Sequence, residues 1–380
     1  MDITLQKTLT FVLFIGIGIL LKLKFNSKEE LSGIKKIILN LALPATIFIA
    51  LIGVKIDGSL LSLPFLALGL NLVLFLGFPL LMPFTGIKKN SPEYRTTRLL
   101  VPSLAPGLTC FPFVLEYLGE AYLAKAAMAD LGNKIFVLII LYLVAMNWYQ
   151  RNSKQKNQSK TKKLKSLVMA MISEPVNIFI ITALILVAYG FSMESLPFFI
   201  QETIGRLSVI MTPLVLLFIG LAVNIKKKQF FKLLSILFLR AGFAVILCGL
   251  LVMVANIEVQ GDILVLLVFG LSACSFWPFS HIAVVEAQEL EVTEKRRTFN
   301  ASFAVNILAL SFPLSTILIL AVLSSGSVFS NVVPILLLGS VLIGLGMIPY
   351  LVKKIAILRS ISEKEKADWI LSKSRQTETT

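Results

Sequence analysis

The chain has 380 residues, of which 57% are hydrophobic, and its mean hydropathy is +0.87. These values exclude a soluble globular protein and predict an all-α protein that crosses a membrane many times. The formal net charge is +15, but the basic residues lie in short segments between apolar stretches. That distribution favours contact with membrane lipids over nucleic acid.

Eleven mainly apolar stretches are predicted to cross the membrane. Segments rich in Lys and Arg follow every second stretch, so the positive-inside rule places the N-terminus outside and the C-terminus in the cytoplasm. The expected location is the plasma (cytoplasmic) membrane, which is the inner membrane of a cell with two. The approximate bounds of the stretches are 8–22, 33–53, 60–84, 98–118, 131–149, 175–192, 206–224, 231–255, 263–285, 298–323 and 331–353.

A polar, basic segment near the middle divides the chain. Residues 1–149 hold five predicted spans that enter from outside, and residues 150–174 are predicted to form a basic cytoplasmic linker. Residues 175–323 hold five spans that begin in the cytoplasm, so the second set is inverted relative to the first. Residues 324–353 add one further transmembrane helix, and 354–380 form a cytoplasmic tail.

An aromatic–Pro–Phe phrase occurs once in each half, around Pro112 and around Pro278. Proline removes an intrahelical hydrogen bond, and backbone groups freed at membrane depth are tolerated only against protein or a water-filled cavity. Interruptions at corresponding positions of two halves mark the binding site of many transporters. We therefore predict that spans 98–118 and 263–285 are broken and cross each other near these prolines.

Three runs resemble the auxin efflux carrier (PIN-like) permease family: Asn-Leu-Ala-Leu-Pro-Ala-Thr at 40–46, Phe-Pro-Phe-Val-Leu-Glu-Tyr-Leu-Gly-Glu at 111–120 and Thr-Pro-Leu-Val-Leu-Leu-Phe-Ile-Gly-Leu at 212–221. The resemblance covers about residues 5–323. It implies two inverted five-helix repeats, crossed fourth and ninth helices, a homodimer formed by scaffold helices, and elevator-like export of organic anions. Two features depart from the family: Ala105 stands where members usually have Asn, and the eleventh span is additional.

Small polar residues near the two prolines are the candidates for binding a substrate. Their alternative role is to let helices pack closely or to satisfy freed backbone groups. The predicted substrate-binding residues are Thr109, Cys110, Pro112, Ser275, Pro278 and Ser280, together with Asn133 and Asn306 on the helices that follow.

Four of the charged or titratable residues inside predicted spans are candidates for a specific role. Glu116 and His281 follow the two prolines by about one helical turn, so they are candidates for proton coupling, or else solvated residues near an interface. Arg240 is predicted to extend toward lipid headgroups, with direct contact to a substrate as the alternative. Lys134 is either an attractor for an anion or an interfacial anchor.

The predicted function is secondary active transport of small organic anions rather than catalysis. The sequence has no nucleotide-binding glycine loop, metal-ligand cluster or nucleophile motif, so neither a cofactor nor a metal is expected. Protons are preferred over sodium as the coupling ion because only one acid, Glu116, lies near the prolines. Two alternatives remain open: a sodium-coupled carrier of the bile-acid type, and a non-transporting membrane sensor or lipid-binding module with a transporter fold.

Overall fold

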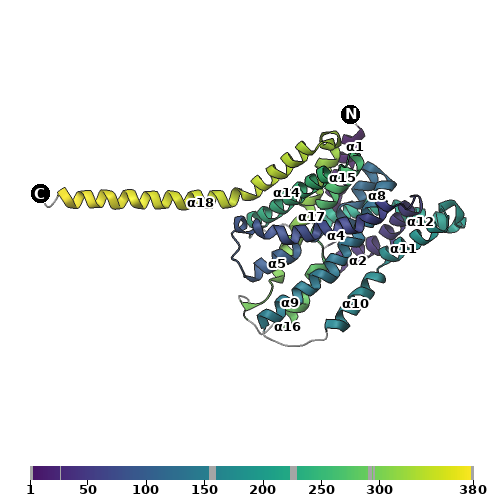
Figure 1. The fold of residues 1–380 in the computed structure, drawn as a ribbon, viewed down its shortest axis with the longest axis horizontal. Helices are drawn as coiled ribbons and strands as arrows, with labels where there is room; N and C mark the ends of the chain where they lie inside the picture. The colour runs from purple at the N-terminus through teal and green to yellow at the C-terminus, as the bar shows by residue number, and fades with distance from the viewer. Residues whose placement is uncertain are drawn as a thin grey trace.

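The computed structural model describes residues 3–25, 27–153, 160–222, 229–289, 293 and 296–377. Within those ranges every regular element is a helix, and the helices form one bundle from which the C-terminal part of α18 extends (Figure 1). The predicted all-α class is confirmed. The first elements are α1 (Ile3–Leu21), α2 (Lys28–Ile37), η1 (Ile38–Ala42), α3 (Leu43–Ile52), α4 (Gly58–Gly77), η2 (Phe78–Leu80), η3 (Met82–Thr85), α5 (Pro92–Leu100), α6 (Pro106–Thr109), α7 (Phe111–Leu118), α8 (Glu120–Ile135), η4 (Phe136–Ile140) and α9 (Leu141–Ser153). The remaining elements are α10 (Lys160–Ile172), α11 (Pro175–Ala188), η5 (Met193–Ser195), α12 (Phe198–Val209), α13 (Met211–Ala222), α14 (Phe230–Val254), α15 (Gln260–Gly270), α16 (Trp277–Gln288), α17 (Ala301–Ser324), η7 (Gly326–Ser330) and α18 (Val332–Thr377).

Seven helices in the described ranges are long and apolar enough to cross a membrane. The protein is therefore a multi-pass membrane protein, as predicted. The other four predicted spans do not count among these seven helices for identifiable reasons. The apolar helix in α1 is counted over Gln6–Leu21 only, α10 and α11 meet at a bend of 58°, and the spans that contain α5 to α7 and α15 to α16 are interrupted. The predicted number of eleven crossings stays a prediction.

The predicted linker contains more helix than the sequence suggested, and the tail is helical as well. Residues 154–159 lie outside the described ranges, but α10 begins at Lys160, because the apolar residues from Leu164 onward give it a surface that can be buried. At the other end of the chain, α18 continues without a break through residues 354–377. The arrangement of the two halves as inverted repeats stays a prediction.

Two unwound segments lie against each other in the middle of the bundle. The first, residues 101–105, separates α5 from α6, and the second, residues 271–276, separates α15 from α16. The N–H of Ala105 donates to the carbonyl oxygen of Ala273 over 2.8 Å. The N–H of Ser275 donates to Oγ of Ser103 over 3.0 Å. Each segment thus supplies partners for backbone groups that the other leaves without helical hydrogen bonds.

The first break does not lie at Pro112, which corrects the prediction. Pro112 occupies the first turn of α7, where the chain only bends at Cys110 (φ −118°, ψ −54°). Pro278 likewise lies in the first turn of α16, directly after the second break. Proline is tolerated there because the first N–H groups of a helix have no intrahelical acceptor. The residue that marks the first break is Pro106, which begins α6.

Arg240 on α14 is buried among the two breaks, with 2% of its surface exposed. Its Nε donates to the carbonyl oxygen of Val101 over 2.8 Å. Its Nη2 donates to the carbonyl oxygens of Ser103 over 3.2 Å and of Ser272 over 2.6 Å. The prediction that Arg240 extends to lipid headgroups is wrong, because the unwound carbonyls offer the guanidinium nearer acceptors inside the protein.

Close helix contacts at small residues fix the helices around the breaks. A Cβ on Gly132 of α8 would meet the backbone carbonyl of Pro64 on α4, so these two helices touch through their backbones. Gly242 and Gly339 bring α14 and α18 together in the same way. Oγ of Ser235 also donates to the carbonyl oxygen of Gly346 on α18. Such contacts are the usual basis of helix packing in membranes, and Figure 1 shows α18 alongside α14.

Side-chain caps begin α4 and α5. A carboxylate oxygen of Asp57 accepts from the N–H of Leu60 at the start of α4, and this bond holds the pKa of Asp57 below its usual value. Oγ of Ser91 accepts from the N–H of Tyr94 at the start of α5. These bonds satisfy amide groups that a helix start leaves free.

Replacing Arg240 with methionine is expected to lower the free energy of unfolding by roughly 3 kcal/mol or more, because three buried carbonyl oxygens lose their donor. Arg240→Lys, which keeps the charge but not the planar fork, should lie in between. Thermal unfolding of the detergent-solubilised protein measures the effect. The control is Arg206→Met, which removes an exposed arginine paired with Glu202. Equal melting temperatures for the methionine variants of Arg240 and Arg206 would contradict a bracing role for Arg240.

Candidate functional site

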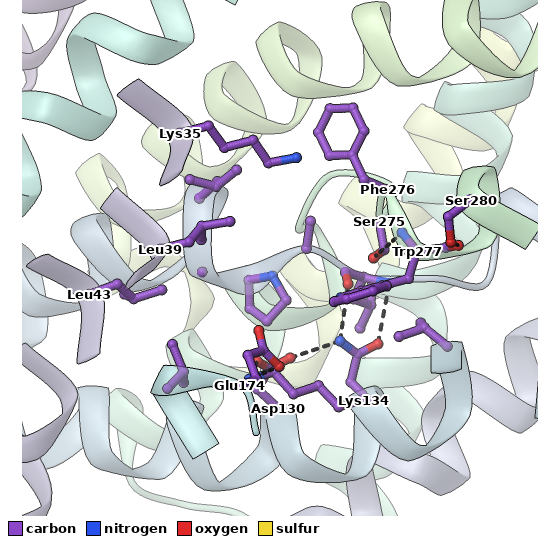
Figure 2. A pocket seen from close by; sticks show the side chains of 18 of the residues that line it. Lys35, Leu39, Leu43, Asp130, Lys134, Glu174, Ser275, Phe276, Trp277 and Ser280 are labelled. Atoms are coloured by element: carbon purple, nitrogen blue, oxygen red, sulfur yellow. Dashed lines mark hydrogen bonds and ion pairs between the residues drawn. The ribbon is translucent and has the colours of Figure 1, made fainter. Parts of the chain in front are cut away.

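A cavity of about 460 Å³ lies where the two breaks meet α2, α8 and the bend between α10 and α11. Figure 2 shows its lining side chains converging from these elements. One wall is largely apolar, and the opposite wall carries charged groups. The lining residues are Lys35, Leu39, Leu43, Leu104, Ala105, Pro106, Gly107, Leu108, Asp130, Asn133, Lys134, Val137, Glu174, Val176, Ser275, Phe276, Trp277, Phe279 and Ser280.

A compact ion cluster forms the charged wall. Nζ of Lys134 lies 3.1 Å from a carboxylate oxygen of Glu174 and 3.6 Å from one of Asp130. It also donates to Oδ1 of Asn177 over 2.8 Å. The side chains of Lys134 and Asp130 are each only 7% exposed. Charges at membrane depth are costly and usually functional, and here each has a partner.

Local backbone geometry explains how this cluster assembles. Asp130 and Lys134 are four residues apart on α8, so they share one face of that helix. Glu174 directly precedes Pro175 and has an extended conformation (φ −67°, ψ 128°). A residue before proline is driven out of the helical region, which ends α10 and produces the bend. The bend brings the carboxylate of Glu174 to the ammonium of Lys134.

Asn133 links the cluster to the first break. Its Nδ2 donates to the carbonyl oxygen of Leu104 over 3.0 Å and to Oδ1 of Asp130 over 2.8 Å. Its Oδ1 accepts from the N–H of Leu104 over 3.3 Å and from Nδ2 of Asn71 over 3.0 Å. The carboxamide of Asn133 therefore pairs with both backbone groups of Leu104, as a peptide group would, and also holds the carboxylate of Asp130 in place.

Lys35 lies on the opposite side of the cavity from the ion cluster (Figure 2). Its Nζ lies 3.6 Å from the centre of the Phe276 ring. Among the described residues, no carboxylate lies within ion-pair distance of Lys35. Phe276 ends the second break and Trp277 begins α16, and both line the cavity and are partly exposed. This wall thus offers one uncompensated positive charge beside two aromatic rings.

Three of the predicted binding residues line the cavity, namely Asn133, Ser275 and Ser280. Ser275 is buried, and its Oγ accepts from the N–H of Trp277 over 3.3 Å at the start of α16. Ser280 is exposed, and its Oγ donates to the carbonyl oxygen of Trp277 over 2.7 Å.

The other five predicted binding residues lie elsewhere. Oγ1 of Thr109 donates to the carbonyl oxygen of Ala105 and accepts from the N–H of Ala273, so it joins the two breaks behind the cavity. Asn306 borders a different cavity of about 220 Å³. The remaining three are buried and outside the lining: Cys110, Pro112 and Pro278.

Glu116 and His281 lie in different surroundings. The carbonyl oxygen of Glu116 accepts from Nζ of Lys7 over 2.6 Å. His281 is buried, with Nε2 3.0 Å from the carbonyl oxygen of Val137 and its ring edge-on to Tyr142. Neither residue lines the cavity, although Val137 does. Their role in proton coupling stays a prediction.

Sequence reasoning did not single out five residues of this site: Lys35, Asp130, Glu174, Phe276 and Trp277. Asp130 and Glu174 each lie one position before a predicted span, where acids are expected to be solvated. Lys35 is one of the basic residues that follow the first predicted span, and such residues indicate topology rather than a binding site. The available signal was the pattern Asp-x-x-Asn-Lys at 130–134, which places three polar groups beside a long apolar stretch.

Replacing Lys134 with methionine is expected to lower the free energy of unfolding by roughly 3–5 kcal/mol, because Asp130 and Glu174 would remain buried without a counter-charge. Adding Asp130→Asn to that variant should restore much of the loss. Thermal unfolding of the solubilised protein measures both.

The matched control on the same helix is Lys125→Met. Lys125 pairs with Asp262 over 2.5 Å, but its side chain is 33% exposed, so its loss should cost no more than about 1 kcal/mol. Equal effects of the two methionine variants would show that the Lys134 cluster has no special stabilising role.

Comparison with known protein families gave no match. The chain is similar to an uncharacterized transporter of Methanocaldococcus jannaschii, with 27% identity over 233 residues. The aligned region covers 60% of this chain and 71% of that protein.

Proposed function

We propose that the protein is a secondary active transporter of small organic anions and that the cavity between the two breaks is its binding site. The observation that carries the proposal is a small cavity at the meeting point of two interrupted helices, with the uncompensated ammonium of Lys35 in its wall. Its volume of about 460 Å³ lies in the range of small-molecule sites. The similarity to a protein named as a transporter supports the same function.

The two walls suit the two ends of an organic anion. Lys35 supplies a positive charge, and α16 begins at Trp277 in the same wall, so the positive end of its dipole adds to the attraction. Phe276, Trp277 and Leu39 offer apolar surface to a hydrocarbon or aromatic group. The two carboxylates of the opposite wall, Asp130 and Glu174, both pair with Lys134, so at most one net negative charge remains in that wall.

The position of Lys134 argues against sodium coupling. Its ammonium occupies the space among the oxygens of Asp130, Glu174 and Asn177, which are the ligands that a sodium ion would need. We propose protons as the coupling ions. The cluster itself is a candidate carrier of these protons, beside the predicted Glu116 and His281.

The inverted repeats, elevator-like movement, export direction and homodimer belong to the same proposal. They rest on the resemblance of residues 40–46, 111–120 and 212–221 to auxin efflux carriers. The close backbone contact of Gly18 on α1 with Gly220 on α13 is consistent with a rigid scaffold made by the first two predicted spans of each half.

Vesicles reconstituted with the full chain and tested with radiolabelled carboxylates should show uptake that saturates. Lys35→Gln should weaken the apparent affinity about tenfold or more, because a charge-assisted contact contributes about 1.5–3 kcal/mol. Lys125→Gln, which removes a lysine outside the cavity, is the control. Equal apparent affinities in the two variants would show that Lys35 does not contribute to substrate binding. Binding without movement under any gradient would favour the non-transporting sensor.

Coupling can be tested in the same vesicles. Collapsing the pH gradient should slow transport, whereas replacing sodium with potassium should leave the rate unchanged. Dependence on sodium would favour the alternative of a bile-acid-type carrier and would contradict the assignment of Lys134 as a built-in cation.

A further inference from the structure

A second cavity, of about 360 Å³, is lined by residues of α4, α5 and α9. It shares no lining residue with the cavity at the breaks. It contains two arginines, an amide and a tryptophan, and no acid. The lining residues are Phe75, Arg98, Leu143, Val144, Asn147, Trp148 and Arg151.

Arg98 is held in this cavity by aromatic rings rather than by hydrogen bonds. Its Cζ lies 5.0 Å from the ring centre of Phe75 and 5.4 Å from that of Trp148. Its Nε is buried and has no hydrogen-bond partner in the described structure. No carboxylate of the described residues lies within ion-pair distance of Arg98. Proteins leave few buried donors unsatisfied, so this guanidinium is placed to meet an acceptor from outside the chain.

Arg151 gives the cavity a second guanidinium. It lies three residues after Trp148 and four after Asn147, so all three share one face of α9. No carboxylate of the described residues lies within ion-pair distance of Arg151. Two planar guanidinium groups and a carboxamide suit the oxygens of a phosphate, because arginine can donate two parallel hydrogen bonds to it.

The surroundings of the cavity identify the source of that phosphate. Leu143 in its wall, Leu76 on α4 and Leu80 on η2 are exposed apolar residues, as expected of a surface that faces lipid chains. Arg151 lies near the end of α9, next to the basic segment that is predicted to be cytoplasmic. The cavity thus lies where an apolar belt meets basic residues, at the level expected for headgroups.

We propose that this cavity binds the headgroup of an anionic phospholipid. The phosphodiester oxygens would accept hydrogen bonds from Arg98 and Arg151, and the acyl chains would extend along the apolar surfaces of α4 and α9. The aromatic rings keep the Arg98 guanidinium oriented before a ligand binds, so little side-chain freedom is lost on binding.

The test uses the delipidated, full-length protein with phosphatidylglycerol or phosphatidylcholine, and native mass spectrometry counts the retained lipids. Phosphatidylglycerol should bind about tenfold or more tightly than phosphatidylcholine. Arg98→Gln and Arg151→Gln should each remove most of that preference, and Arg98→Lys should retain part of it. Arg206→Gln, which removes an exposed arginine on α12, should bind like the wild type. Equal retention of the two lipids, or glutamine variants that keep the preference, would overturn the proposal.

Inorganic phosphate distinguishes a lipid from a free anion. When the protein is held in phosphatidylcholine, adding millimolar inorganic phosphate should raise its melting temperature less than adding phosphatidylglycerol does. An equal rise would assign the site to a soluble phosphate instead.

The fluorescence of Trp148 provides a second readout if Arg98→Gln folds poorly. In the W277F/W369F background, where Trp148 is the remaining tryptophan, brominated phosphatidylglycerol should quench its fluorescence more than brominated phosphatidylcholine, and Arg151→Gln should abolish the difference. Equal quenching by the two brominated lipids would overturn the proposal.

Discussion

The guanidinium of Arg240 stabilises the two unwound segments at the centre of this molecule. An unwound segment at membrane depth exposes N–H and carbonyl groups that have no water to bind, and each unsatisfied group costs several kcal/mol. Arg240 donates to carbonyl oxygens of both breaks, and the breaks exchange hydrogen bonds with each other through Ala105 and Ala273. The cavity exists because these partners replace two lost stretches of helix.

A continuous polar network connects the first break to the charged wall. Asn71 on α4 donates to Asn133, which binds the backbone of Leu104 and the carboxylate of Asp130. Asp130 in turn faces Lys134, which reaches Glu174 at the bend of the next helices. A change in the protonation or pairing of the cluster would therefore be felt by the unwound backbone. This is a physical route by which a coupling ion could influence the binding site, because both share Asn133.

The sequence was sufficient for the helical class and for the position of most apolar helices, because hydropathy averaged over a span is a strong signal. It placed the first break wrongly because proline alone does not distinguish the middle of a helix from its first turn. The true position depends on partners that are distant in sequence, Arg240 and residues 271–276. The acids of the site were missed for a related reason: Asp130 and Glu174 lie at the edges of apolar stretches, and only the tertiary fold shows that they are buried.

The cavity holds its positive charge in a form that an anion can use. Lys35 lies over the ring of Phe276, and a cation–π contact of this kind contributes about 0.5–2 kcal/mol. A carboxylate offers the ammonium a stronger, charge-assisted hydrogen bond. The ring can therefore hold Lys35 in position without competing with the ligand, and it becomes part of the apolar wall once the ammonium turns to the anion. The same principle applies to Arg98 beside Phe75 and Trp148: in both cavities, aromatic faces orient a cation whose hydrogen-bond donors remain available.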